Sequence, residues 1–176
     1  MAKDVNDNVT ISPEITNFSQ SGLKQINAIH EYDNKLYLAT SFAIVVYDIE
    51  NLEFGDTYFI GFGSTNINVT DITVFNNEIF AATDDGIYVA DVTNPNLIDA
   101  NNWTLRFAGT YEDIAMFGGD LYATSNSDLV RLDGTITTNV LTFSETISSV
   151  KVFANSLSVS LSNDCLLYTS PSPRDA

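Results

Sequence analysis

Apolar and polar residues alternate along four separate stretches of the chain, and each stretch is interrupted near its middle by a short turn sequence. The stretches are LKQINAIHEYDNKLYLAT, NVTDITVFNNEIFAAT, GTYEDIAMFGGDLYAT and ISSVKVFANSLSVS. Alternation with a period of two predicts half-buried β-strands, and two-residue loops of Asn, Asp or Gly are typical of hairpin turns. Because no window has apolar residues at helical spacing, the sequence predicts an all-β protein.

The four hairpins recur at a spacing of about 40 residues. The aromatic residue that closes the first strand recurs at steps of 43, 42 and 36 residues, at Tyr32, Phe75, Phe117 and Phe153. The same steps separate three other apolar columns, which are Ile26, Val69, Tyr111 and Ile147, then Ile29, Ile72, Ile114 and Val150, then Leu36, Ile79, Leu121 and Leu157. A repeat of this length built from short strands is typical of β-propeller blades.

Each blade is expected to contain four strands, and the last blade is incomplete. Third strands are predicted at AIVVYD, GIYVAD and DLVRLD, and fourth strands at TYFIGF, WTLRF and VLTF. The predicted blades are residues 23–66, 67–108, 109–144 and 145–164, preceded by a polar connector or an outer strand of an earlier blade at residues 1–22. About three and a half blades do not close a ring, so the end blades should expose apolar faces and make the chain marginally stable or prone to aggregate.

The last twelve residues, CLLYTSPSPRDA, resemble a translation of sequencing-adapter DNA. Residues 165–176 are therefore expected to be an artefact, with the natural sequence ending near Asp164. In the repeat register, Cys165–Tyr168 nevertheless fall where the first blade has its third strand. Cys165 is the single cysteine, so the rest of the chain offers neither a disulfide framework nor a thiolate metal site.

Charge excludes several classes of partner. The chain has 7 basic and 23 acidic residues and a net charge of −16. Such a chain repels nucleic acid and anionic lipid surfaces. No apolar run reaches the length of a membrane span, so direct membrane insertion is not expected, and the first residues lack the apolar stretch of a signal peptide.

The candidate polar residues favour structural roles. His30, the lone histidine, is predicted to be an ordinary surface or channel-facing side chain, with a pH-sensitive contact as the minor alternative. Asp48, Asp91 and Asp133 recur at one blade position, where Asp commonly accepts hydrogen bonds from turn amides. Serine hydrolysis is not supported, since no G-x-S-x-G turn is present.

A second acidic pair, Asp71 and Asp113, lies at matched positions in two blades. Together with Glu112 these residues could line the mouth of a central channel, although solvated residues at strand starts are the favoured interpretation. Asp84-Asp85-Gly86 is predicted to be a loop leading into a third strand. A calcium loop beginning at Asp4 fails because Val9 and Ile15 stand where Gly and Glu are needed.

Two further patterns carry little weight. The sequons at Asn17, Asn68 and Asn102 matter only in a glycosylating pathway. Trp103 and Tyr58 could stack on a sugar or a partner if exposed, but aromatic residues of propellers usually pack between blades. We therefore expect no catalytic, cofactor-binding or metal-binding residue in this chain.

The run FGDTYFIGFGS, the run VFNNEIFAATDDGIYVADVTNPNLIDANNWTLRF and the run MFGGDLYATSNSDLVRLDG resemble the N-terminal propeller of PorZ-type proteins. The resemblance covers about residues 24–163, and the NPNLIDANNW loop is its most distinctive part. It implies a protein of two propellers and a small β domain at the cell surface of Bacteroidetes. There it would act in the type IX secretion system, with the sortase machinery that attaches cargo to lipopolysaccharide.

The expected function is therefore a non-enzymatic interaction module of an exported or cell-surface protein in type IX secretion. Its partners would be other secretion or surface proteins, and a glycan or lipopolysaccharide is a further option. Two alternatives stay open. One is a periplasmic ligand-sensing propeller of a two-component regulator, and the other is a carbohydrate-binding or carbohydrate-active propeller that uses acids such as Glu112 and Asp113.

Overall fold

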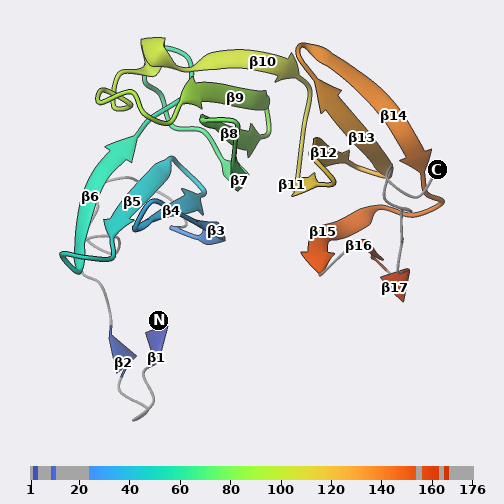
Figure 1. Cartoon of the computed structure of the whole chain (residues 1–176), viewed down its shortest axis with the longest axis horizontal. Helices are drawn as coiled ribbons and strands as arrows, with labels where there is room; N and C mark the ends of the chain where they lie inside the picture. The colour runs from blue at the N-terminus through green and yellow to red at the C-terminus, as the bar shows by residue number, and fades with distance from the viewer. Residues whose placement is uncertain (1, 4–8, 11–23, 154–155, 163–164, 167–176) are drawn as a thin grey trace.

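The computed structural model describes residues 2–3, 9–10, 24–153, 156–162 and 165–166. In this part of the chain, antiparallel sheets stand side by side as blades along an open arc (Figure 1). The first strand of each blade lies nearest the centre of the arc and the last strand lies farthest from it. The prediction of a partial propeller whose ring is not closed is confirmed.

The strands of each blade follow one another in chain order across its sheet. The first blade contains β3 (Ile26–Tyr32), β4 (Lys35–Thr40), β5 (Ile44–Asp48) and β6 (Glu53–Tyr58). The second contains β7 (Val69–Phe75), β8 (Glu78–Thr83), β9 (Gly86–Asp91) and β10 (Thr104–Ala108), with the short 3-10 helix η1 (Ala100–Asn102) before its last strand.

The later blades repeat this arrangement. The third contains β11 (Ile114–Phe117), β12 (Asp120–Ser125), β13 (Asp128–Asp133) and β14 (Ile136–Thr142). The fourth contains β15 (Ile147–Phe153), β16 (Ser156–Leu161) and the short β17 (Cys165–Leu166). A separate two-stranded pair joins β1 (Ala2–Lys3) and β2 (Val9–Thr10). Among the residues described, no helix is both long and apolar enough to cross a membrane.

The hairpin turns adopt the conformation that their sequences predicted. Asp33 and Asn34 have φ of 50° and 57°, and Gly118 and Gly119 have φ of 63° and 91°. Asn, Asp and Gly tolerate positive φ, which two-residue hairpin loops require. The weaker turn predicted at residues 154–155 lies outside the described residues.

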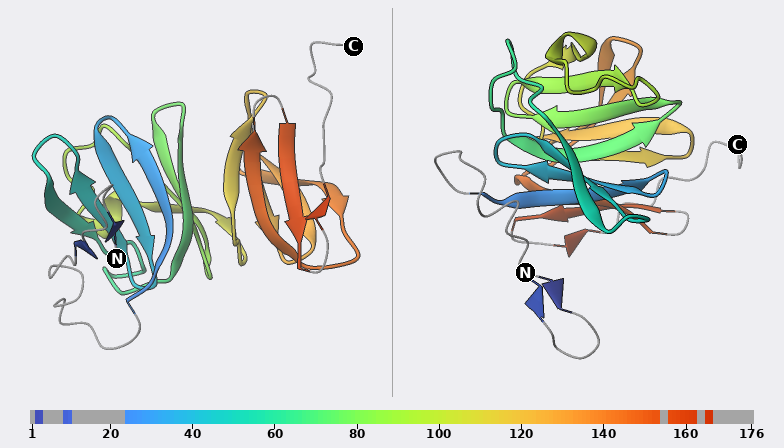
Figure 2. Two further views of the ribbon diagram at one scale, coloured as in Figure 1. Left: turned by 90° about the horizontal axis from the view of Figure 1, so that it is seen from below. Right: turned by 90° about the vertical axis from the view of Figure 1, so that its left-hand side faces the viewer.

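The core lies between the blades. Three clusters of buried side chains each join two consecutive blades, and the largest unites the first and second blades through residues such as Tyr37, Val46, Ile72 and Ile79. Figure 2 shows the blades as tilted sheets packed face to face. Each blade therefore buries its apolar face against a neighbour.

Three predicted strands have different bounds in the structure. The fourth strand of the third blade, predicted at VLTF, begins at Ile136 and ends at Thr142. The fourth strand of the first blade begins at Glu53, after the turn at Asp48, and ends at Tyr58, so TYFIGF is mostly a loop. The first strand of the third blade begins at Ile114. Tyr111 instead donates its amide to the Thr83 carbonyl of the preceding blade at 3.1 Å.

Both ends of the arc expose apolar side chains, as predicted. Ile29 is 60% exposed, whereas its counterpart Ile72 in the second blade is 3% exposed. At the other end Phe153 is 66% exposed, against 8% for Phe117. Cys165–Leu166 pair with β16, at the place that the repeat register gave them, and residues 167–176 lie outside the described part.

Candidate functional site

The inner strands β3, β7, β11 and β15 together line a hollow of about 340 Å³ on the concave side of the arc. The lining comes from equivalent positions in each blade, namely Ile29, His30, Asp71, Ile72, Thr73, Val74, Ile114, Ala115, Met116, Val150, Lys151 and Val152. Because the repeat brings the first strand of every blade to the inner side of the arc, these strands place polar and apolar groups along one groove.

His30 faces this groove, as predicted for a channel-facing side chain. Its Nε2 accepts a hydrogen bond from the Val74 amide of the second blade at 3.2 Å. Burial lowers the pKa of His30 below 6.5, and an accepting Nε2 requires the neutral ring. The contact thus ties two blades together and depends on the protonation state of the ring.

Asp71 is buried, so its favoured interpretation as a solvated residue at a strand start was wrong. The side chain is 7% exposed, and its Oδ2 accepts a hydrogen bond from the Ile114 amide of the third blade at 3.2 Å. Its Oδ1 accepts from the Ile72 amide at 2.9 Å. Burial raises the pKa of the Asp71 carboxyl, against the opposing effect of the Ile114 hydrogen bond.

Asp113 makes the equivalent contact one blade further on. Its Oδ1 lies 3.4 Å from the Lys151 Nζ of the fourth blade, and its side chain is 15% exposed. Burial raises the pKa of Asp113, while Lys151 opposes the shift. Asp71 and Asp113 therefore act alike, since each carboxylate reaches the first strand of the following blade.

Glu112 is bound to a turn within its own blade. Its Oε2 accepts a hydrogen bond from the Asn126 amide at 3.1 Å, and Asn126 has a positive φ of 56°. Burial raises the pKa of Glu112. The described carboxylates of Glu112, Asp71 and Asp113 all have structural partners, and no group of three or more His, Cys, Asp or Glu side chains in the described ranges could hold a metal ion.

Two of the three aspartates that recur at one blade position, Asp48 and Asp91, form Asx turns. Asp48 Oδ1 accepts from the Asn51 amide at 2.8 Å, and Asp91 Oδ1 accepts from the Thr93 amide at 2.8 Å. The Asn51 amide lowers the pKa of the Asp48 carboxyl, and the Thr93 hydroxyl, which donates at 2.7 Å, lowers the pKa of the Asp91 carboxyl together with the Thr93 amide. The turn interpretation is confirmed for these two residues.

The predicted loop at Asp84-Asp85-Gly86 leads into β9. Thr83 Oγ1 donates to the Gly86 carbonyl at 2.6 Å and accepts from the Gly86 amide at 3.1 Å.

Two of the three sequon asparagines make local contacts. Asn68 donates to the Asp84 carboxylate at 3.1 Å, and the Asn102 side chain donates to the Asn96 carbonyl at 2.7 Å. Asn17 lies outside the described residues, as does the rejected calcium loop apart from the backbone of Val9 and Thr10.

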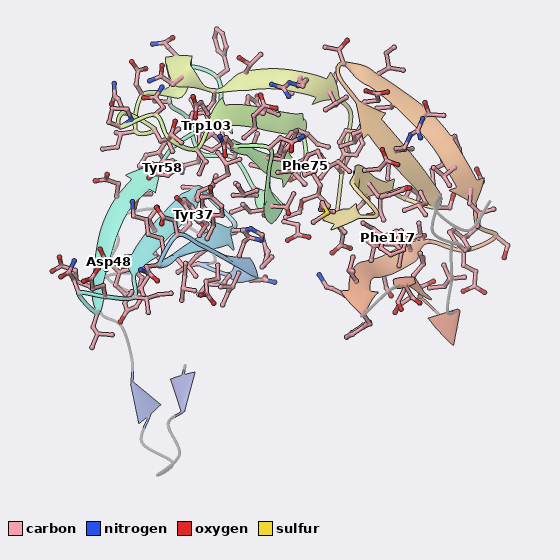
Figure 3. All side chains as sticks on the ribbon, in the orientation of Figure 1. Tyr37, Asp48, Tyr58, Phe75, Trp103 and Phe117 are labelled. Atoms are coloured by element: carbon pink, nitrogen blue, oxygen red, sulfur yellow. The ribbon has the colours of Figure 1, made fainter. Side chains whose placement is uncertain are left out.

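Trp103 and Tyr58 pack between blades and are not exposed. They are 6% and 7% exposed, and their ring centroids lie 6.2 Å apart (Figure 3). Trp103 Nε1 donates to the Leu97 carbonyl at 2.9 Å, and burial raises the pKa of Tyr58 to about 12. Stacking of these two rings on a sugar is therefore excluded in this conformation.

Sequence reasoning missed two features. Lys151 is not among the residues that the sequence indicated, although its separation of 38 residues from Asp113 is close to the blade spacing and could have suggested a contact. Phe62, placed in a predicted strand, instead lies on a tight turn and is 94% exposed. The two flanking glycines of GFG were the available signal.

The fold and the groove define a β-propeller whose inner strands carry inter-blade contacts. The chain belongs to the family described as the N-terminal beta-propeller domain of PorZ, TSS9, whose model matches residues 3–104. No curated protein sequence matches the chain.

Solved structures support the fold. The structure of PorZ, described as an essential bacterial surface component of the type-IX secretion system of Porphyromonas gingivalis, is 19% identical with a TM-score of 0.75. The match covers 97% of this chain and 23% of PorZ. The extracellular domain of a putative hybrid two component system from B. thetaiotaomicron is 14% identical with a TM-score of 0.60, covering 90% of this chain and 24% of that one. BamB from Moraxella catarrhalis is 12% identical with a TM-score of 0.58, covering 82% and 44%.

Proposed function

We propose that this propeller is a non-enzymatic interaction module at the bacterial cell surface, acting with other proteins of the type IX secretion system. The observation that carries the proposal is the family match over residues 3–104. PorZ itself is described as a surface component of that system. The chain spans about a quarter of PorZ, so the role of this module within a larger assembly is part of the proposal.

The groove supports a binding role over acid-base chemistry. The carboxylates of Asp71 and Asp113 bridge adjacent blades, and Glu112 holds a turn. A general acid or base must be free to reach a substrate proton. Groups engaged in holding blades together are poorly placed for that task, whereas a rigid blade array suits the display of a binding surface.

The experiment is done in the native bacterium, with the encoded protein tagged and, in a second strain, with residues 24–162 deleted in frame. We expect protease added to intact cells to remove the tag, other type IX components to co-purify with the protein, and the deletion to stop release of type IX cargo. Normal cargo release in the deletion strain would contradict the role in secretion. Polysaccharide turnover by the purified protein would contradict the non-enzymatic part.

A further inference from the structure

The connector between the first and second blades, residues 59–68, carries the most exposed large apolar side chain among the residues described. Phe62 is 94% exposed at its tip. The two later connectors, residues 109–113 and 143–146, are shorter and have no exposed large apolar side chain. A phenyl ring left in water forgoes the favourable free energy of burying its apolar surface. The exposure of Phe62 therefore needs an explanation, whereas the other two connectors have no such exposed side chain to explain.

The turn beneath Phe62 is closed by two hydrogen bonds. The Thr65 amide donates to the Gly61 carbonyl at 3.3 Å, and Thr65 Oγ1 donates to the Phe62 carbonyl at 3.0 Å. Gly63 and Ser64 have positive φ of 68° and 60°. A Cβ on Gly61 would lie 2.6 Å from the Thr65 carbonyl oxygen, so only glycine fits there. The ring is thus carried by a turn of defined conformation.

The base of this connector is part of the main core. Ile60 and Ile67 belong to the same buried cluster as Leu97 and Trp103, which come from the loop at residues 92–103. That loop exposes a second apolar side chain, Ile98, which is 50% exposed. Two loops that share one buried base therefore each present an apolar group to solvent.

The charge of the two segments indicates what kind of surface would fit them. The connector 59–68 and the loop 92–103 contain no Lys or Arg and one acidic residue, Asp99, and the strands that lead into them add Glu53, Asp56 and Asp91. The whole chain has a net charge of −16. A partner surface with basic groups around an apolar pocket would be attracted to these segments, whereas an acidic one would be repelled.

We propose that Phe62, together with Ile98, is the anchor of a docking surface for a folded protein whose own surface has an apolar pocket edged by Lys or Arg. Aromatic side chains dominate binding energy when they fill such pockets, and a turn held in its bound conformation reduces the entropy lost on association. This inference rests on the proposed role as an interaction module and specifies the surface that it uses.

The experiment replaces Phe62 by the photo-cross-linking residue p-benzoylphenylalanine in the native bacterium. The matched control carries the same residue at Leu52, which is 73% exposed on the turn between β5 and β6. We expect one discrete adduct from position 62 and none from position 52. The cross-linked protein is then purified and titrated with the unmodified chain and with Phe62→Ser, Ile98→Ser and Leu52→Ser.

Phe62→Ser should weaken binding by about thirtyfold or more, as expected for an aromatic anchor. Leu52→Ser should change the affinity by less than about twofold, and added salt should weaken the complex. Absence of an adduct, or equal affinity of Phe62→Ser and the unmodified chain, would overturn the inference. Cargo release that requires residues 24–162 but tolerates Phe62→Ser would reject this surface while leaving the proposed function standing.

Discussion

Single side chains link neighbouring blades along the inner strands, since no ladder of backbone hydrogen bonds joins one described sheet to the next. His30 accepts an amide of the second blade, Asp71 accepts one of the third, and Asp113 pairs with Lys151 of the fourth. Burial raises the pKa of Asp71 and of Asp113 against the opposing effect of their partners, whereas burial alone lowers the pKa of His30. The ionisation of these three groups is therefore coupled to the packing of the blades.

The contact of His30 predicts a specific pH dependence. Burial lowers its pKa in the folded chain, so as pH falls below about 6.5 the unfolded chain takes up a proton that the folded chain resists. The unmodified chain should therefore lose stability relative to His30→Gln, whose amide oxygen can accept the same hydrogen bond without titrating. Chemical denaturation of both chains between about pH 8 and 5 measures this difference, with His at its ordinary pKa near 6.5 as the reference. Parallel stability curves for the two chains would refute the prediction.

Asp71 predicts the opposite trend. Its pKa is raised in the folded chain, so folding favours the protonated form and stability rises on acidification toward the ordinary value of 3.8. The unmodified chain should gain stability relative to Asp71→Asn over that range.

At neutral pH, Asp71→Ala should lower the free energy of unfolding by about 1–3 kcal/mol, because the buried Ile114 amide loses its acceptor.

Urea denaturation of these variants provides the measurement. Asp71→Asn, which keeps an oxygen for the Ile114 amide, is the matched control and should lose less than the alanine variant. If alanine were tolerated as well as asparagine, the hydrogen bond between the blades would carry no stability.

At the scale of elements, hairpin turns and strand entries decide where each blade begins and ends. Thr83 closes the loop before β9, and Gly86 begins the strand with φ of 143°. A Cβ on Gly86 would overlap the Phe107 carbonyl oxygen of β10. The glycine therefore allows the third and fourth strands of the second blade to approach each other.

Gly86→Ala is expected to cost about 2 kcal/mol or more, because it combines an unfavourable φ with contact against backbone that cannot move freely. Gly118→Ala is its matched control, since Gly118 also has positive φ but a Cβ added there would meet no atom within 4 Å. The control should cost only about 1 kcal/mol. Thermal denaturation followed by circular dichroism compares the two, and equal losses would contradict the steric argument.

At the scale of the whole molecule, the two end blades of the arc have no neighbouring blade on one side within the described part of the chain. Ile29 and Phe153 are exposed there, whereas their counterparts Ile72 and Phe117 are buried between blades. Exposed apolar surface of this kind promotes association, while the net charge of −16 opposes it.

The chain is therefore expected to self-associate as its concentration rises, and to do so more strongly in added salt, which screens the charge repulsion. Ile29→Ser with Phe153→Ser should reduce the association, and sedimentation velocity measures it. A Leu52→Ser chain, changed at an exposed site away from both end faces, serves as the control. A monomer with a cooperative thermal transition at all concentrations would contradict the expectation.

The blade repeat, the strand order and the hairpin turns followed from the sequence because they depend on local properties. Alternation with a period of two identifies a strand, and the pairs Asp33-Asn34 and Gly118-Gly119 supply the positive φ that a tight turn needs. The family resemblance could also be recognised from the sequence, and the family match confirms it.

Only the tertiary structure decided which polar side chains are buried between blades and which apolar ones are left in water. Asp71 meets Ile114, which lies 43 residues further along the chain, and Phe62 is exposed on the turn that Gly61 and Thr65 close. The reason is physical. Alternation along a strand shows which side chains share a face of the sheet. Which side chains of one blade meet those of the next depends on contacts between residues about 40 positions apart, and local alternation does not encode these contacts.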